Sequence, residues 1–182
     1  MNEFVKQDGL PKYPEMERII KIYPSPQILL GEEIHWTEKR DGSQLRIAWV
    51  DGKVQIATRH QDEASEMFVK FFYQTPKAEA LITLLKDANG LCENPAANFN
   101  TGAILFGEML SKGKSPARFE THDSYDFILF DIWSQTEGKF LSYGGAYAYA
   151  YHYGIPFVES WALTRHTTIE SLLAYRDEML VL

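Results

Sequence analysis

The stretch Thr37-Glu38-Lys39-Arg40-Asp41-Gly42-Ser43 places a lysine in a short polar segment between two runs that are typical of strands. Ile34-His35-Trp36 lies upstream, and residues 45–50 downstream alternate in the pattern of a half-buried strand. Asp41-Gly42 directly after the lysine favours a turn. A lysine held at a strand edge can act as a nucleophile when burial or a neighbouring cation favours its neutral amine. A solvated lysine in a hairpin is the simpler interpretation of this stretch alone.

Composition limits the class of protein. The chain has 182 residues, of which 45% are hydrophobic, and this fits one globular domain or one domain plus a fragment. Cys92 is the only cysteine, which excludes an internal disulfide and fits a reducing compartment. The sequence shows no secretory signal, and its apolar runs are too short to span a bilayer. We therefore expect a soluble, cytoplasmic protein with no membrane partner.

Charge and aromatic content leave nucleic-acid binding open. The formal net charge is −7, whereas a protein that binds nucleic acid over its whole surface is usually basic. A local basic groove is compatible with that charge. Aromatic residues make up 14% of the chain, and they could lie in the core or stack on bases.

Strand signals continue after the lysine stretch. Asp51-Gly52 is a strong signal for a two-residue hairpin, so residues 44–50 and 53–58 should pair antiparallel. Residues 102–110 and 125–133 are apolar runs of strand length. We expect both of these runs to be strands as well.

Helical patterns occupy much of the remaining chain. Residues 13–21 begin with proline and acids, residues 64–88 carry apolar faces divided at Thr75-Pro76, and residues 168–180 are amphipathic. The tyrosine-rich residues 143–153 favour a helix that is closed by the following glycine. The alternation of tyrosines in that segment fits a strand equally well.

Two strands end in residues that could serve a site. Glu108 follows Gly107 in an apolar strand, and a carboxylate there must meet water, a partner or a ligand because unpaired burial is costly. The glycine would let another group approach the backbone closely. Phe130, beside Asp131, could lie against a ligand ring. An ordinary glutamate at a strand end and a core phenylalanine are the commoner interpretations of each residue alone.

Basic residues near these strands could bind phosphate. Arg59 follows a predicted strand, and Lys112, Lys114 and Arg118 lie in a loop after Glu108. Solvated surface positions explain them equally well. The five histidines show no metal-ligand spacing, and the sequence has no phosphate-binding glycine pattern.

In order, these stretches resemble the motifs of the covalent nucleotidyltransferases, which are the ATP-dependent RNA and DNA ligases and the mRNA capping enzymes. Thr37 to Gly42 resembles their lysine motif, Thr58-Arg59-His60 their arginine element, and Leu105 to Glu108 their third motif. Tyr125 to Ile132 resembles the aromatic strand whose phenylalanine stacks on the base. Four elements in order are far more specific than any one, and they cover about residues 13–160.

Two details make the chain most similar to the RNA ligases. Thr37-Glu38 precedes the lysine, and Gln44 stands where DNA ligases and capping enzymes usually carry arginine. The resemblance implies that Lys39 attacks ATP to form a lysyl-AMP, with Mg²⁺ or Mn²⁺ as the metal. The AMP then activates the 5′-phosphate end of RNA, or of DNA, for sealing to a 3′-hydroxyl.

The resemblance also implies further site residues. Arg59 would contact phosphate or ribose, Glu108 would hold the ribose and help position a hydrated metal ion, and Phe130 would stack on adenine. Glu38 would lie near the base, while Gln44, Lys112 and Lys114 are weaker candidates for phosphate or substrate contacts. The metal ligands stay open apart from Glu108 acting through water.

The implied fold is α+β, with antiparallel sheets that form a nucleotide cleft flanked by helices in an ATP-grasp-like arrangement. The family's fourth motif, Glu-Gly followed by hydrophobic residues, and its fifth, Lys-x-Lys, do not follow in this sequence. We therefore expect residues 1–182 to be an adenylation domain that is incomplete at its C-terminal end. A DNA ligase, a capping-type guanylyltransferase and an inactive nucleotide-binding module are the alternatives, and the oligomeric state stays open.

Overall fold

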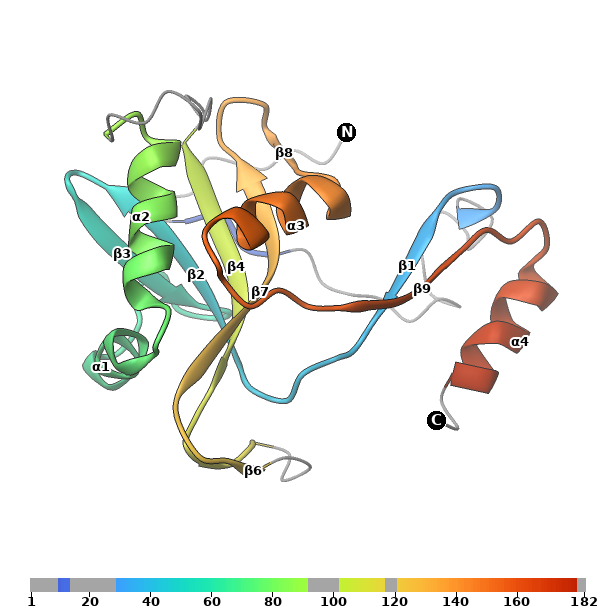
Figure 1. Cartoon of the computed structure of the whole chain (residues 1–182), viewed down its shortest axis with the longest axis horizontal. Coiled ribbons are helices and arrows are strands. Elements are labelled where there is room, and N and C mark those ends of the chain that lie inside the picture. Colours follow the sequence, from blue (N-terminus) through green and yellow to red (C-terminus); the bar gives the residue numbers. More distant parts are fainter. Residues whose placement is uncertain (1–9, 14–28, 92–101, 117–120, 180–182) are drawn as a thin grey trace. The chain divides into compact units, whose positions relative to one another are not determined.

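The computed structural model describes residues 10–13, 29–91, 102–116 and 121–179, and these fall into two compact units. The larger unit contains residues 10–13 and runs from Lys39 to Val158, and the described part of the smaller unit consists of residues 29–38 and 159–179. Figure 1 shows the elements of each unit. The helix expected at 13–21 and the loop expected at 94–100 fall almost wholly outside the described residues.

An antiparallel sheet in the order β3-β2-β4-β7-β8 forms the larger unit. Its strands are β2 (Ser43–Val50), β3 (Lys53–Thr58), β4 (Ala103–Leu110), β7 (Asp126–Ser134) and β8 (Lys139–Phe140). The predicted hairpin is confirmed, with φ of 49° at Asp51 and 81° at Gly52. Positive φ at both positions is what a two-residue turn of this hand requires.

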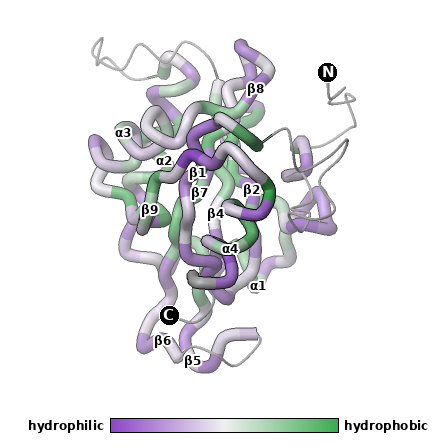
Figure 2. The backbone as a smooth tube through the Cα atoms, turned by 90° about the vertical axis from the view of Figure 1, so that its right-hand side faces the viewer, coloured by the Kyte–Doolittle hydropathy of each residue, from purple (hydrophilic) through white to green (hydrophobic). Residues whose placement is uncertain are grey.

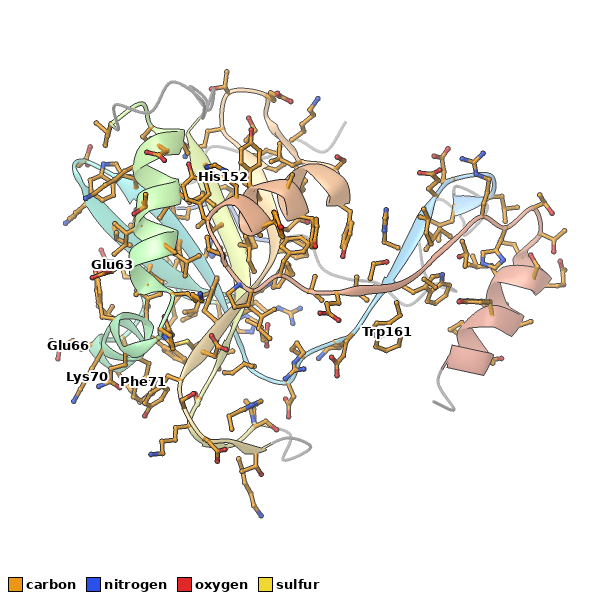
Figure 3. The ribbon with its side chains drawn as sticks, viewed as in Figure 1. Glu63, Glu66, Lys70, Phe71, His152 and Trp161 are labelled. Carbon is orange, nitrogen blue, oxygen red and sulfur yellow. The ribbon has the colours of Figure 1, made fainter. Side chains whose placement is uncertain are left out.

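Three helices cover one face of this sheet: α1 (Glu66–Gln74), α2 (Ala78–Ala88) and α3 (Tyr143–His152). The predicted break near Thr75 is confirmed, and the Thr75 hydroxyl donates to the Phe72 carbonyl at 2.8 Å. Figure 3 shows Glu66 and Lys70 projecting outward from α1, while Phe72 is buried beneath it. The tyrosine-rich segment is a helix, because Ala146 and Ala150 face the core while Tyr147 and Tyr151 are exposed.

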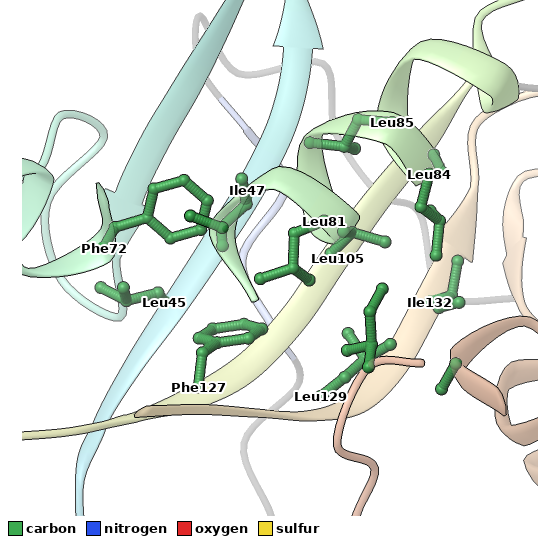
Figure 4. Packing of buried hydrophobic residues seen from close by; sticks show 14 of the residues in the cluster. Leu45, Ile47, Phe72, Leu81, Leu84, Leu85, Leu105, Phe127, Leu129 and Ile132 are labelled. Atoms are coloured by element: carbon green, nitrogen blue, oxygen red, sulfur yellow. The ribbon is translucent and has the colours of Figure 1, made fainter. Parts of the chain in front are cut away.

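The main hydrophobic core lies between the helices and the sheet (Figure 4). Strands β2 and β4 contribute every second residue to it, as the pleat of a strand requires. Its fully buried members include Leu45, Ile47, Phe72, Leu81, Leu84, Leu85, Leu105, Met109, Phe127, Leu129 and Ile132. A smaller cluster covers the opposite face and contains Leu10, Ala48, Ala57, Ile104, Phe106 and Trp133.

The smaller unit pairs strand β1 (Ile34–Thr37) antiparallel with β9 (Ser160–Thr164), and helix α4 (Ile169–Met179) follows. The Trp36 indole N–H donates to the Thr164 hydroxyl at 2.7 Å. The run before the lysine is therefore a strand as predicted, but it belongs to a different sheet from β2. This excludes the interpretation of Lys39 as the turn of a simple hairpin.

The basic loop expected after Glu108 contains a short hairpin. Strand β5 (Gly113–Lys114) pairs with β6 (Thr121–His122), and Figure 2 colours this region mostly hydrophilic. Among the helices in the described part of the chain, none is long and apolar enough to cross a membrane.

Candidate functional site

Lys39 is exposed in the connection that leads into β2. Gly42, three residues later in the same connection, contacts β4. The Gly42 amide donates to Glu108 Oε1 at 3.1 Å. A Cβ at position 42 would lie 2.5 Å from the Met109 carbonyl oxygen and 2.7 Å from Glu108 Cγ. The glycine is therefore required by close approach to β4, and the predicted lysine and third motifs meet here.

Glu108 is half-buried and lies opposite Gln44 in the register of β4 and β2. Burial raises the pKa of Glu108 above its usual range, and the nearby Asp41 adds to that shift. The Gly42 amide and the cations Lys39 and Arg59 act in the opposite direction on this pKa. Lys39, Asp41 and Arg59 are thus close enough to Glu108 to affect its charge.

Arg59 begins the turn that follows β3. The Thr58 amide donates to the Gln61 carbonyl at 3.0 Å, and the Gln61 amide donates to the Thr58 hydroxyl at 3.1 Å. This closed turn exposes Arg59 and His60 at its tip. The sequence predicted that an arginine after the hairpin could hold a phosphate, and the register of β3, β2 and β4 brings that arginine to the sheet end that carries Glu108.

Phe130 lies on the same sheet face as Glu108, at a bulge in β7. The register shifts there, because Phe106 pairs with Asp131 while Gly107 pairs with Leu129. Alternation from the core residue Leu129 puts Phe130 on the face opposite the helices. The bulge then keeps Asp131, which pairs with Phe106, on that same face. Phe130 is half-buried, and its ring lies 5.0 Å edge-on from that of Tyr13.

Tyr13, whose ring contacts Phe130, is also hydrogen bonded to Asp131. The Tyr13 hydroxyl donates to Asp131 Oδ2 at 3.0 Å. Burial raises the pKa of Asp131 to about 6, although hydrogen bonds from Tyr13 and the Ile132 amide favour its charged form. Burial and the neighbouring Asp131 together raise the pKa of Tyr13. Sequence patterns gave no signal for this pair, because 118 positions separate its members.

Arg46 is the other residue that sequence reasoning missed. It alternates with Leu45 and Ile47 in the predicted half-buried strand, and it is fully buried. A basic residue within an apolar alternation is the signal that could have found it. Its partners are the residues of the turn after β3 and the carbonyl of Leu10.

The remaining predicted residues lie on other segments. Glu38 is exposed in the smaller unit, Lys114 is exposed in β5, and Lys112 is exposed just before that strand. Arg118 lies outside the described residues. Across residues 10–13, 29–91, 102–116 and 121–179, no three histidine, cysteine, aspartate or glutamate side chains gather as a ready-made metal site. Asp41 and Glu108 are the neighbouring carboxylates beside Lys39.

Solved structures with this fold include RNA ligases from two sources. The Naegleria gruberi RNA ligase, as a mutant with ATP and Mn, aligns with a TM-score of 0.70 and 19% identity over 91% of this chain and 47% of its own. An archaeal ATP-dependent RNA ligase aligns with a TM-score of 0.60 and 18% identity over 85% of this chain and 38% of its own. The chain therefore spans less than half the length of these proteins.

Two comparisons of the sequence itself gave different results. A search of curated protein sequences finds no match to this chain. The sequence model of the RNA ligase family matches residues 32–178, a range that contains both the lysine stretch and the strands carrying Glu108 and Phe130. Since that match covers most of the chain and the α+β fold with antiparallel sheets agrees with it, the chain belongs to the RNA ligase family.

Proposed function

We propose that this chain is an ATP-dependent adenylation unit of an RNA ligase, with Lys39 as the residue that receives AMP. The observation that carries the proposal is the hydrogen bond from the Gly42 amide of the lysine motif to Glu108 of the third motif, at the sheet end where Arg59 follows β3. Three separate motifs converge on one half-buried carboxylate. That convergence is hard to explain by stability alone, because burying a carboxylate costs free energy unless partners compensate.

The chemistry is a displacement at phosphorus. Lys39 Nζ, in its neutral form, attacks the α-phosphorus of ATP, a new N–P bond forms, and the P–O bond to pyrophosphate breaks. The proton from the amine passes to solvent, and AMP stays on the lysine as a phosphoramidate. Negative charge develops on the phosphoryl oxygens and on the leaving group, so a nearby cation such as Arg59 stabilises the transition state more than the ground state.

The remaining residues would position the nucleotide. Phe130 offers an aromatic ring for stacking with adenine, an interaction worth about 1–3 kcal/mol. Glu108 would accept hydrogen bonds from the ribose hydroxyls, and Glu38 would lie near the base. Gln44, opposite Glu108, is a further polar contact on the same face.

The two carboxylates beside Lys39 fit a magnesium or manganese ion. Such ions keep several waters and need only one or two carboxylates together with substrate phosphates, and Asp41 directly precedes Gly42, whose amide donates to Glu108. Asp41 would hold the ion directly and Glu108 through water. When bound, the ion supplies neutralisation of charge on the phosphate oxygens.

RNA is the proposed acceptor of the AMP. The 5′-phosphate end of a strand would take AMP from Lys39, and a 3′-hydroxyl would then displace the AMP to seal the strand. Membership of the RNA ligase family supports this choice, and DNA ends are the alternative. The net charge of −7 implies that the acceptor is held by a local groove or by further protein surface.

The test is to incubate the protein with ATP and Mg²⁺ or Mn²⁺ and to map any AMP adduct by mass spectrometry. We expect one adduct, on Lys39, that is absent from Lys39→Ala and retained in Lys53→Ala, a matched exposed lysine of the same unit. An adduct on another lysine contradicts the assignment. ATP binding without any adduct would favour an inactive nucleotide-binding module, and nicked RNA and DNA duplexes distinguish the two acceptors.

A further inference from the structure

Among the described residues, Arg46 is the largest fully buried side chain. Its guanidinium lies on the sheet face that carries Glu108, because residues 44, 46 and 48 of β2 share that face. Burying a cation is costly unless its donors are satisfied. A buried arginine at this position is therefore expected to have a role that an apolar side chain could not fill.

The donors of Arg46 point mainly at backbone carbonyls. Nε and one terminal nitrogen donate to the Thr58 carbonyl at 3.1 and 2.7 Å, and that same nitrogen donates to the Gln61 carbonyl at 3.0 Å. The other terminal nitrogen donates to the Leu10 carbonyl. A contact to Asp62 at 3.3 Å completes the set. Half of the Asp62 side chain is exposed, so this ion pair is the weakest of these contacts in free energy.

These carbonyls belong to the turn that carries Arg59. Thr58 and Gln61 are the first and last residues of that turn and are already hydrogen bonded to each other. Arg46 accordingly holds both ends of the turn from beneath. Arg59 lies between those ends and directly follows Thr58, which pairs with Leu45 of β2. The adjacent residue of β2, Gln44, pairs with Glu108, so the strand register brings Arg59 to the sheet end that carries Glu108.

We propose that Arg46 is a positioning residue for lysine adenylation, which holds the Thr58–Gln61 turn so that Arg59 stays beside Glu108. The inference rests on the proposed role of Arg59 at the phosphate or ribose of ATP. Arginine suits the task because its planar fork presents several donors in fixed directions. A lysine at position 46 keeps the charge but offers one compact ammonium group, which cannot hold several carbonyls in the same geometry.

The experiment is a double-mutant cycle on the rate of adduct formation at Lys39 as ATP is varied. Arg59→Ala should lower kcat/KM about tenfold to a hundredfold, as expected for loss of a charged contact. Arg46→Lys should lower kcat/KM about tenfold in the natural background but by less than about twofold when Arg59 is already alanine. Asp62→Asn, which removes only the exposed ion pair, should stay within about twofold of the unmodified protein.

Hydrogen exchange supplies a readout of position. In Arg46→Lys, the Thr58 amide should exchange faster, whereas amides of α2 on the other face should keep their protection. If Arg46→Lys does not fold, Arg46→Gln removes the buried charge while keeping an amide donor, and it enters the same cycle. Equal losses in both backgrounds, or a general rise in exchange, would assign Arg46 a structural role and overturn the inference.

The outcomes separate this inference from the proposed function. An absent adduct in the unmodified protein defeats the proposed function and the inference that rests on it. An adduct on Lys39 with no effect of Arg59→Ala defeats the inference alone, because Arg46 would then have no functional group to position. Unchanged exchange of the Thr58 amide in Arg46→Lys contradicts it as well.

Discussion

The two faces of the five-stranded sheet bury different kinds of side chain. The face beneath the helices buries a large apolar cluster, beside which the buried Asp87 of α2 accepts a hydrogen bond from Tyr153 at 2.6 Å. The opposite face combines a smaller apolar cluster with the buried Arg46, the half-buried Glu108 and the Tyr13–Asp131 hydrogen bond. Burial of apolar side chains stabilises the folded state without needing specific partners. Burial of a polar group costs free energy unless its hydrogen-bond partners are in place. The second face therefore buries more polar groups, and it carries the proposed site residues Glu108 and Phe130.

The largest expected contrast is between two phenylalanines of β7 that lie on opposite faces. Phe127 is fully buried beneath the helices, so Phe127→Ala should lower the free energy of unfolding by about 3–5 kcal/mol. Phe130 is half-buried at the bulge, so Phe130→Ala should cost less stability but weaken ATP binding about tenfold or more. Denaturant unfolding and ATP affinity are measured on both variants.

The reverse result would be informative. If Phe130→Ala were as destabilising as Phe127→Ala while ATP affinity stayed the same, Phe130 would be an ordinary core residue. That result would contradict the proposed difference between the two faces of the sheet.

Two glycines provide a second contrast, of intermediate size. A Cβ on Gly107 would lie 2.1 Å from Phe127 Cζ, so Gly107→Ala should lower stability by about 1–3 kcal/mol through overpacking. A Cβ on Gly42 would displace Glu108, so Gly42→Ala should slow adduct formation about a hundredfold. Melting temperatures and single-turnover rates are compared. A Gly42→Ala protein with the natural rate would contradict the role of the Gly42 contact in placing Glu108.

The Tyr13–Asp131 pair predicts a pH dependence. Because the pKa of Asp131 is raised from 3.8 to about 6 in the folded protein, its stabilising protonation is complete below about pH 4 and lost as pH rises through 6. Asp131→Asn should therefore be more stable than the natural protein above pH 7, by on the order of 2 kcal/mol, with the difference shrinking toward pH 4. Unfolding curves at pH 4, 6 and 8 measure it. A difference that does not change with pH would show that Asp131 does not titrate in this window.

The smallest effect is expected at an exposed ion pair outside both faces. Lys139 Nζ lies 2.9 Å from Glu137 Oε2, and the lysine side chain is 68% exposed. Lys139→Ala should change the free energy of unfolding by less than about 0.5 kcal/mol, because exposed pairs contribute little. This variant is the baseline for the others in the same unfolding assay. A loss near that of Gly107→Ala would show that the method does not resolve the comparison.

Local rules predicted most of the elements. Asp51-Gly52 determined a hairpin because few dipeptides accept two positive φ values, and Thr75-Pro76 separated α1 from α2 because proline cannot continue a helix. The pairing of β1 with β9 was not predicted. It joins residues more than 120 positions apart, and no local pattern specifies which distant strand a short apolar run will meet.

The sequence by itself determined the order of the motifs, and with it the candidates Lys39, Arg59, Glu108 and Phe130. These residues could be proposed from the sequence because their side-chain types suit the proposed reaction. Only the tertiary structure decided that Gly42 must approach Glu108, and that Arg46 is buried beneath the turn of Arg59. The reason is that burial and hydrogen-bond partners arise from strand register and bulges. These features depend on how all the strands pair, so no single stretch of sequence specifies them.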